Sequence, residues 1–162
     1  MSTMLCGIDA STSATSISFF EDGIFKDYKL IQINKKEKPT QWDRLNPMIK
    51  NILDVLELYQ PNIIYQEDSW KGKNIDTLKC LTNIIGSVRG WAIKNDCEFY
   101  TLTPAAWRSK VGIQKYEAER SDLKNAGIQF VKEKYNIDVP TDDVSDSILV
   151  GLAGLKTYGL IE

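Results

Sequence analysis

Hydrophobic positions along this chain follow two different periods, and the change between them separates the expected strands from the expected helices. Short apolar or alternating runs predict strands at 4–10, 15–20, 24–33, 62–67 and 97–102. Apolar residues spaced three or four apart predict helices at 41–59, 75–94, 104–110, 117–134 and 142–158. Local signals support two of these boundaries: Glu21-Asp22-Gly23 is typical of a hairpin turn, and Thr103-Pro104 is typical of a helix start.

The order of these elements, β-β-β-α-β-α-β-α-α-α, predicts an α/β protein. Three antiparallel strands followed by β-α units give a mixed five-stranded sheet with helices on both faces. The 162 residues fit a single domain, 1–162. Ligand sites in such sheets form at the carboxyl ends of strands, so the polar residues that follow strands are the first candidates for a site.

Composition narrows the chemistry of any such site. The chain contains no histidine, which excludes Ser-His-Asp catalysis and His-ligated zinc. Its three cysteines, without C-x-x-C spacing, are typical of reduced, mostly buried thiols rather than of a zinc site. A metal ion would therefore be bound by oxygen, which favours Mg²⁺, Mn²⁺ or Ca²⁺. No run reaches the roughly 18–20 apolar residues of a membrane span, and the first residues lack signal-peptide features, so we expect a cytoplasmic protein.

The net charge of −2 conceals an uneven distribution. Between Ser69 and Lys115, eight Lys or Arg residues accompany three Asp or Glu residues, a balance of +5, so the remainder carries −7. This pattern fits a phosphate-binding face beside an acidic centre. A chance fluctuation in a solvated surface is the alternative.

Acidic residues follow two of the predicted strands. Asp9 ends an apolar run and leads into a loop of small residues, which leave room for an ion or a phosphate. Glu67 and Asp68 both follow the next buried strand, and the alternation of side chains along it does not choose between them. One acid from each strand could therefore converge with others at the edge of the sheet.

The last predicted helix supplies further acids. Asp143 and Asp146 are three residues apart and Asp142 and Asp146 are four apart, so both pairs share a helix face. Asp142 has an alternative explanation as an N-terminal residue favoured by the helix dipole. Asp146 precedes a long apolar run, where a charge needs a partner or a metal ion, so it is the strongest single candidate from the residues alone. Clustered carboxylates repel one another, and divalent cations remove that penalty.

Taken in order along nearly the whole chain, these segments resemble the RuvC family of Holliday-junction resolvases. The resemblance rests on Gly7-Ile8-Asp9-Ala10-Ser11, Glu67-Asp68-Ser69-Trp70 and Asp143-Val144-Ser145-Asp146-Ser147, with Arg44-Leu45, Gln60-Pro61, Lys73-Asn74 and Arg89-Gly90 in support. It implies a ribonuclease H-like fold and a homodimer that acts on four-way DNA junctions with Mg²⁺ or Mn²⁺. It also implies a set of metal ligands that are catalytic: Asp9, Glu67, Asp143 and Asp146.

The activity of that family implies a two-metal hydrolysis of phosphodiester bonds. Two oxygen-ligated ions about 4 Å apart would activate the attacking water and stabilise the leaving 3′ oxygen. The implied products are paired nicks with 5′-phosphate and 3′-hydroxyl ends, one from each subunit. The richness in Lys, Ile and Asn resembles the phage-encoded branch, which acts in the host cytoplasm on a wider range of branched DNA and with less need for a branch-migration motor.

The resemblance also indicates which residues contact DNA. Arg120 matches a catalytic basic position near the active site, where it would neutralise the developing charge of the phosphodiester, and Arg108 or Lys110 matches a second basic position. Trp70 matches an aromatic residue that stacks on bases at the junction, although a core tryptophan is the alternative. The full set of expected DNA contacts is Trp70, Lys71, Lys73, Arg108, Lys110, Lys115 and Arg120. Each basic residue in it could equally be a solvated surface charge.

The remaining tryptophans and two helix glycines have structural interpretations. We expect Trp42, Trp91 and Trp107 to be packing residues. Gly86 and Gly90 lie one turn apart in the helix 75–94, where small residues permit the close approach of another element. The family dimerises through this helix, and close packing on the chain's own sheet is the alternative.

Two other functions remain compatible with these residues: a ribonuclease H-like nuclease that cuts RNA/DNA hybrids, and a non-catalytic protein that binds branched DNA. The first strand and loop also resemble those of actin-like ATPases. Those enzymes need two such domains around a nucleotide, and 162 residues supply only one.

Overall fold

The computed structural model describes residues 1–68, 74–113 and 120–162, of which Arg120 and Ser121 are described by their backbone alone. The strands are β1 (Met4–Asp9), β2 (Ala14–Glu21), β3 (Ile24–Gln32), β4 (Ile63–Glu67) and β5 (Glu98–Leu102). The helices are α1 (Gln41–Tyr59), α2 (Ile75–Lys94), α3 (Pro104–Val111), α4 (Arg120–Tyr135) and α5 (Asp142–Tyr158). The predicted order is confirmed, and the expected first turn of α4 at 117–119 lies outside the described residues.

The five strands form one mixed sheet in the order β3-β2-β1-β4-β5. β1, β2 and β3 pair antiparallel, whereas β4 is parallel to β1 and β5 is parallel to β4. This is the predicted mixed sheet. Ile8 of β1 pairs with Gln66 of β4, so the residues that follow them, Asp9 and Glu67, occupy neighbouring positions at the carboxyl ends of the two strands.

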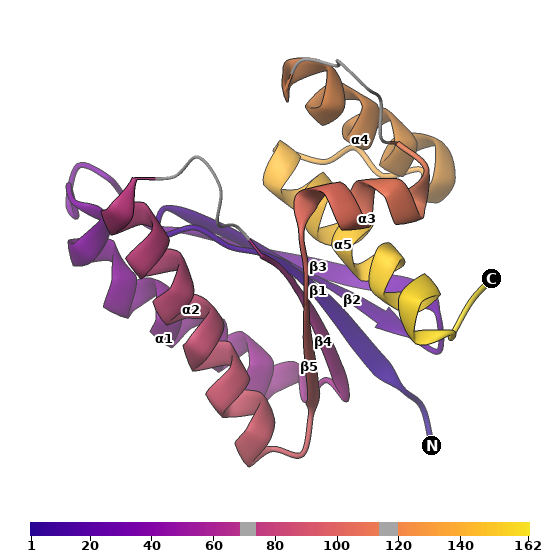
Figure 1. Ribbon diagram of the computed structural model, residues 1–162, viewed down its shortest axis with the longest axis horizontal. Helices are drawn as coiled ribbons and strands as arrows, with labels where there is room; N and C mark the ends of the chain where they lie inside the picture. Colours follow the sequence, from indigo (N-terminus) through magenta and orange to yellow (C-terminus); the bar gives the residue numbers. More distant parts are fainter. Residues whose placement is uncertain (69–73, 114–119) are drawn as a thin grey trace.

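Helices cover both faces of the sheet, as predicted (Figure 1). α1 and α2 pack on one face, where Cys6 and Ile8 of β1 join their buried cluster. α5 packs on the other face together with residues of α3 and α4, and Leu5 of β1 belongs to that second cluster. The alternation of side chains along β1 therefore divides its residues between two cores.

Glycines bring α5 into direct backbone contact with the centre of the sheet. A Cβ atom on Gly7 of β1 would lie 2.3 Å from the backbone nitrogen of Gly151, and one on Gly151 would lie 2.4 Å from the ring of Phe20. Neither distance is compatible with a side chain larger than hydrogen. The two glycines therefore determine how deeply α5 sits on β1, and so how close the first turns of α5 come to Asp9.

Most of the packing expectations hold, with one correction. The three cysteines are free and buried, and Trp91 and Trp107 are buried as predicted. The prediction for Trp42 is wrong, because 45% of this residue is exposed. It lies in the first turn of α1 beside the exposed loop 34–40, and the buried face of the helix begins only at Arg44 and Leu45.

Within the described ranges, every helix is too short or too polar to cross a lipid bilayer.

Candidate active site

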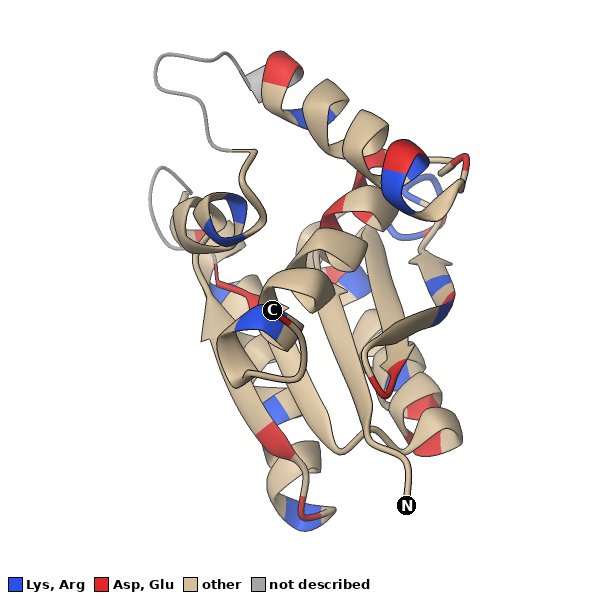
Figure 2. Ribbon diagram, turned by 90° about the vertical axis from the view of Figure 1, so that its right-hand side faces the viewer, with Lys and Arg blue, Asp and Glu red and all other residues tan. Residues whose placement is uncertain are grey.

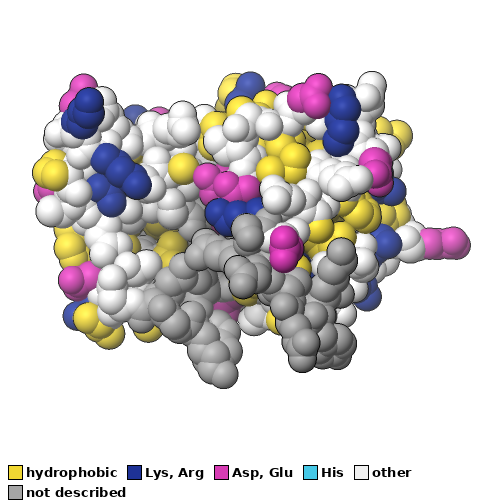
Figure 3. Space-filling model, turned by 90° about the horizontal axis from the view of Figure 1, so that it is seen from above, with side chains coloured by type: hydrophobic (Ala, Val, Ile, Leu, Met, Phe, Trp, Pro, Cys, Tyr) yellow, Lys and Arg dark blue, Asp and Glu magenta, His cyan; other side chains and the backbone are white. Residues whose placement is uncertain are grey.

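A cavity of about 620 Å³ opens where β1 and β4 end and α5 begins. Its acidic lining residues come from three separate parts of the chain: Asp9, Glu67, Asp142, Asp143 and Asp146. The central strands carry almost no charged residues until they reach this edge of the sheet (Figure 2). Seen from above, acidic side chains gather at the centre of this face beside a basic side chain (Figure 3). The structure thus brings together the acids that the sequence pattern indicated.

Glu67, the last residue of β4, is tied to α3 by a hydrogen bond. The indole Nε1 of Trp107 donates to Oε2 of Glu67 at 2.6 Å, while the rest of the Trp107 side chain is buried in the core. A hydrogen bond to an ionised carboxylate is shorter and stronger than one between neutral groups. The bond therefore restricts the rotamers of Glu67 and makes α3 part of the site.

Buried serines fix the part of α5 that carries Asp146. The hydroxyl of Ser18 donates to the carbonyl of Ser147 at 2.7 Å, and the hydroxyls of Ser16 and Ser147 are hydrogen-bonded at 2.7 Å. All three serines are fully buried, where a hydrogen bond is strong and a missing one is costly. Ser16 pairs with Asp9 in the ladder between β2 and β1. The serine hydrogen bonds therefore link the backbone that carries Asp146 to the backbone that carries Asp9.

Burial and mutual repulsion raise the pKa values of the cavity acids. Burial, followed by the charge of Glu67, raises the pKa of Asp146 to about 7. Burial also raises the pKa of Asp9 well above its ordinary value, and the charges of Glu67 and Asp146 add to the effect. The pKa of Asp143 is raised by burial and by a neighbouring carboxylate, while a hydrogen bond with Asp9 limits the rise. A cation bound here would favour the charged carboxylates and lower these pKa values again.

The donor atoms of the cavity fit hard divalent cations, which prefer oxygen. Carboxylates dominate its lining, and the small loop after β1 adds the hydroxyl residues Ser11, Thr12 and Ser13. As the side chains stand, no three acidic or cysteine residues of the described ranges are grouped closely enough to hold one ion. Joint coordination of an ion would therefore require the acidic side chains to shift from their present positions.

The position of each acid bears on the alternatives left open by the sequence. Glu67 lines the cavity, whereas Asp68 does not. The backbone amide of Asp68 instead donates to the carbonyl of Leu102 at 2.8 Å, which continues the pairing of β4 with β5. Asp142 does line the cavity, and its carboxylate forms an ion pair of 2.8 Å with Lys124 of α4.

Of the two alternative basic positions on α3, only Arg108 lines the cavity; Lys110 is exposed and lies outside it. The guanidinium of Arg108 lies 4.8 Å from the centre of the Trp107 ring, and its charge lowers the pKa of Asp146, against the effect of burial. Its Nε atom is buried and has no hydrogen-bond partner among the described residues. Arg108 is therefore the α3 residue with a free donor at the acidic cavity.

Among the residues that the structure describes, two other basic residues line the cavity, Arg44 of α1 and Lys124 of α4. Arg44 is buried, and its Nη1 donates to the carbonyls of Lys38 and Pro39 at 2.9 Å, which holds the preceding loop to the start of α1. Both residues lie outside the segment 69–115 whose charge balance indicated a basic face. The charge balance of that segment therefore identifies only Arg108 of these three basic residues. Arg44 and Lys124 come from helices that are distant from it in the sequence.

Several predicted DNA contacts cannot be located in this way. Trp70, Lys71 and Lys73 fall in 69–73 and Lys115 falls in 114–119, both of which are outside the described residues. Arg120 is the first residue of α4, and its side chain is likewise outside the description. Their roles remain predictions.

The sequence interpretation gave no site role to Arg44, Trp107 or Lys124. Trp107 was assigned to packing alone, although a buried indole N–H needs an acceptor and the acids at strand ends were available. Lys124 lies four residues after Arg120, so both positions share one face of α4. That spacing was the signal that could have identified it.

Comparison with known proteins agrees with this architecture, although no protein-family model matches the chain. The crossover junction endodeoxyribonuclease RuvC of Caldanaerobacter subterraneus subsp. tengcongensis is 30% identical over 125 residues, which cover 74% of this chain and 70% of that protein. RuvC of Dictyoglomus turgidum is 26% identical over 153 residues, 90% of this chain and 91% of that protein. The solved structure of T. thermophilus RuvC in complex with a Holliday junction substrate shares the fold, with a TM-score of 0.73 over 98% of both chains at 11% identity. The resemblance seen in the motifs is therefore confirmed, and the chain belongs to the RuvC family of crossover junction endodeoxyribonucleases.

Proposed function

We propose that this chain is a metal-dependent, structure-selective endonuclease that resolves four-way DNA junctions by paired nicks. The observation that carries the proposal is the meeting of acids from β1, β4 and α5 in one cavity of a RuvC-family chain. Two relatives are named for crossover junction cleavage, and a neighbouring structure contains a Holliday junction. The products would be nicks with 5′-phosphate and 3′-hydroxyl ends.

Enzymes of this family generally use divalent metal ions, and we propose two Mg²⁺ ions per site, with Mn²⁺ as a substitute. Asp9, Glu67, Asp143 and Asp146 would hold them. Bound ions lower the pKa of an attacking water and stabilise charge on the leaving oxygen. The contribution of the protein itself is placement, since two parallel strands and one anchored helix hold the acids around a single cavity.

Arg108 would bind a phosphate at this cavity. Its buried Nε lacks a hydrogen-bond partner among the described residues, and a phosphate oxygen would supply one. Its charge already acts on Asp146, so a phosphate that it binds lies next to the acids. Further DNA contacts proposed from the family resemblance are Trp70, Lys71, Lys73, Lys110, Lys115 and Arg120.

We further propose that the active form is a homodimer built on α2. Gly86 and Gly90 are exposed, and no atom of the described residues lies within 4 Å of a Cβ built on either one. They therefore do not serve close packing within the described part of the chain. Ile93, 72% exposed, follows on the same helix face. A second copy would cover this face and supply the second active site that paired nicks require.

A cleavage assay tests the proposed function. End-labelled four-way junction, replication fork, linear duplex and RNA/DNA hybrid are each incubated with the protein and Mg²⁺. We expect symmetric nicks in the junction, some cleavage of the fork, as for the phage-encoded branch, and little cleavage of the other two. Asp146→Asn should bind the junction without cutting it. Asp122→Asn, which removes an exposed charge of α4 that does not line the cavity, is the matched control and should cut normally.

The same assay distinguishes the rival functions. Preferential cleavage of the hybrid would indicate a ribonuclease H-like enzyme. Tight junction binding without cleavage in either Mg²⁺ or Mn²⁺ would indicate a non-catalytic junction-binding protein and would overturn the proposal.

A further inference from the structure

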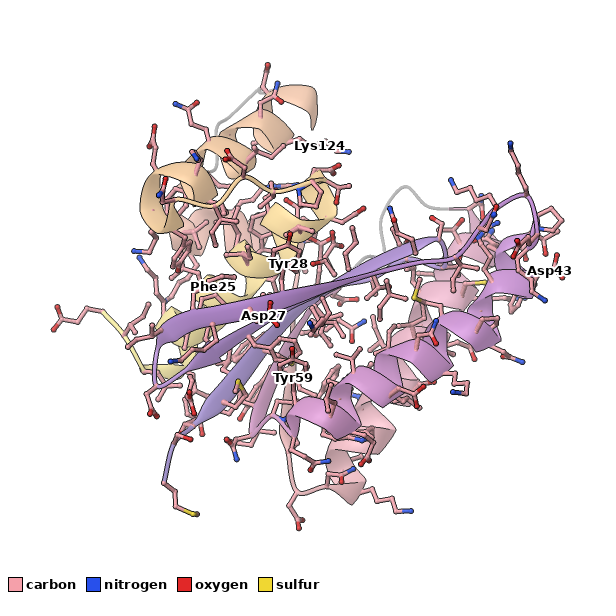
Figure 4. The ribbon with its side chains drawn as sticks, turned by 180° about the vertical axis from the view of Figure 1, so that it is seen from behind. Phe25, Asp27, Tyr28, Asp43, Tyr59 and Lys124 are labelled. Atoms are coloured by element: carbon pink, nitrogen blue, oxygen red, sulfur yellow. The ribbon has the colours of Figure 1, made fainter. Side chains whose placement is uncertain are left out.

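The proposed cleavage chemistry assigns no role to the ion pair between Lys124 and Asp142 in the cavity. Lys124 Nζ lies 2.8 Å from Oδ2 of Asp142, and both residues line the same cavity as the proposed metal ligands. In Figure 4 the Lys124 side chain leaves α4 on the side that faces the start of α1, where Asp43 is labelled. Its charge also reaches Asp143, whose pKa it lowers against the effect of burial. Lys124 therefore places a cation in the same cavity as the proposed metal ligands.

The degree of exposure indicates that this ion pair can open. The side chains of Lys124 and Asp142 are 35% and 31% exposed, so both are partly buried and accessible to water. An ion pair so accessible to water contributes little to the stability of the fold, and its partners can separate at small cost. A DNA phosphate that enters the cavity presents the same type of anionic oxygen to Lys124 as Asp142 does.

The charged residues around the cavity indicate why Lys124 would exchange Asp142 for a DNA phosphate. Five acids and three basic residues line it in the described part of the chain, so a phosphate that enters competes with carboxylates for the basic groups. Arg44 is already engaged with two backbone carbonyls. Lys124 is therefore the basic residue whose partner is another cavity side chain and whose long, flexible stem lets it move to a ligand.

We propose that Lys124 is a phosphate-contacting residue that Asp142 holds in reserve, and that DNA binding transfers Lys124 from Asp142 to a backbone phosphate beside the cleavage site. This inference rests on the proposed function. It assigns Asp142 the role of an internal competitor that weakens DNA binding, in contrast to a metal ligand. Asp142 and DNA then compete for one ammonium group, so the two substitutions that break the ion pair act in opposite directions.

The test is a double-mutant cycle on junction binding, measured by fluorescence anisotropy with a four-way junction in EDTA over a range of salt concentrations. Lys124→Gln should weaken binding by about twofold to fivefold and reduce the slope of log affinity against log salt by about one. Asp142→Asn should strengthen binding by a similar factor. In the background of Lys124→Gln, Asp142→Asn should lose most of its effect, because the residue that it releases is absent.

The same helix offers a matched control. Lys132 and Asp138 form an ion pair of 3.0 Å that does not line the cavity. Lys132→Gln and Asp138→Asn remove the same charges, so their effects on junction binding measure the contribution of net charge alone. The effects at Lys124 and Asp142 should exceed them and should be coupled, whereas those at Lys132 and Asp138 should be small and additive.

Two results would overturn the inference. One is an unchanged salt slope in Lys124→Gln, which would mean that Lys124 contacts no phosphate. The other is an equal gain in junction affinity from Asp142→Asn in the wild type and in Lys124→Gln. That result would mean that Asp142 weakens binding only by repelling the DNA. The wild-type protein distinguishes failure of this inference from failure of the proposed function. If the wild type neither binds the junction preferentially nor cuts it, the proposed function itself is refuted.

Discussion

Replacing Asp146 by asparagine is expected to stabilise the free protein at alkaline pH while it abolishes cleavage. The substitution keeps the size of the side chain and removes its charge. Burial raises the pKa of Asp146 to about 7 from an ordinary value of 3.8. The folded protein therefore holds a proton on Asp146 over a pH range in which the unfolded chain has lost it.

The size of the effect follows from that difference in pKa. Because the folded state binds more protons than the unfolded state between about pH 4 and pH 7, the free energy of unfolding falls as the pH rises through this window. The difference of about 3 pH units corresponds to about 4 kcal/mol at 1.4 kcal/mol per unit. Local relaxation and water entry reduce this figure, so we expect a stabilisation of about 2–4 kcal/mol at pH 8 and less than about 1 kcal/mol at pH 4.

Urea unfolding followed by tryptophan fluorescence between pH 4 and pH 8, in EDTA, measures this effect. The curves of the wild type and of Asp146→Asn should converge at acidic pH and separate as the pH rises. Asp122→Asn, at an exposed position of α4, controls for the loss of one charge. Addition of Mg²⁺ at pH 8 should stabilise the wild type more than Asp146→Asn, since the ion binds only the folded site. A stability difference that does not change with pH, or a variant less stable than the wild type at pH 8, would refute the reasoning.

Three further substitutions test the packing of the site and of the fold. Trp107→Phe should cost about 1.5–3 kcal/mol in urea unfolding and lower the cleavage rate of a junction, because it removes the hydrogen bond to the Glu67 carboxylate and leaves a small cavity in the core. Gly7→Ala should cost more than about 3 kcal/mol or prevent folding, as judged by circular dichroism, because its Cβ would lie 2.3 Å from the backbone of Gly151. Trp42→Ala should change the free energy of unfolding by less than about 1 kcal/mol, since this residue is 45% exposed.

The sequence was sufficient for the elements of the fold because the signals that define them are local. The starts of α1, α2 and α5 and the ends of β4 and β5 coincide with the predicted bounds, where capping residues, prolines and changes of period are closely spaced along the chain. Trp42 shows the limit of such signals, because burial depends on which elements cover a residue. A helix period cannot tell that the first turn of α1 lies beside an exposed loop.

The candidate site was only partly predictable for a related reason. Acids at strand ends and on one helix face can be identified from spacing, and the structure does bring Asp9, Glu67 and Asp146 to one cavity. The partners that tune them are long-range contacts. The bond from Trp107 to Glu67 spans 40 residues, and that between Ser16 and Ser147 spans 131. No pattern within a single element encodes contacts of this kind.

Asp146 lies near the N-terminal end of α5, and the packing of the rest of this helix explains why the burial of Asp146 is tolerated. α5 contributes an almost continuous run of buried residues from Val144 to Leu155, so its contact with the sheet is secured independently of its acids. Apolar burial of this extent supplies far more stabilisation than one raised pKa removes. The glycine contact at Gly151 and the serine hydrogen bonds at Ser147 then hold the helix close to β1 and keep Asp146 beside the other acids. The packing that stabilises the fold is therefore also what keeps the acids repelling one another, and that repulsion is what a bound cation would relieve.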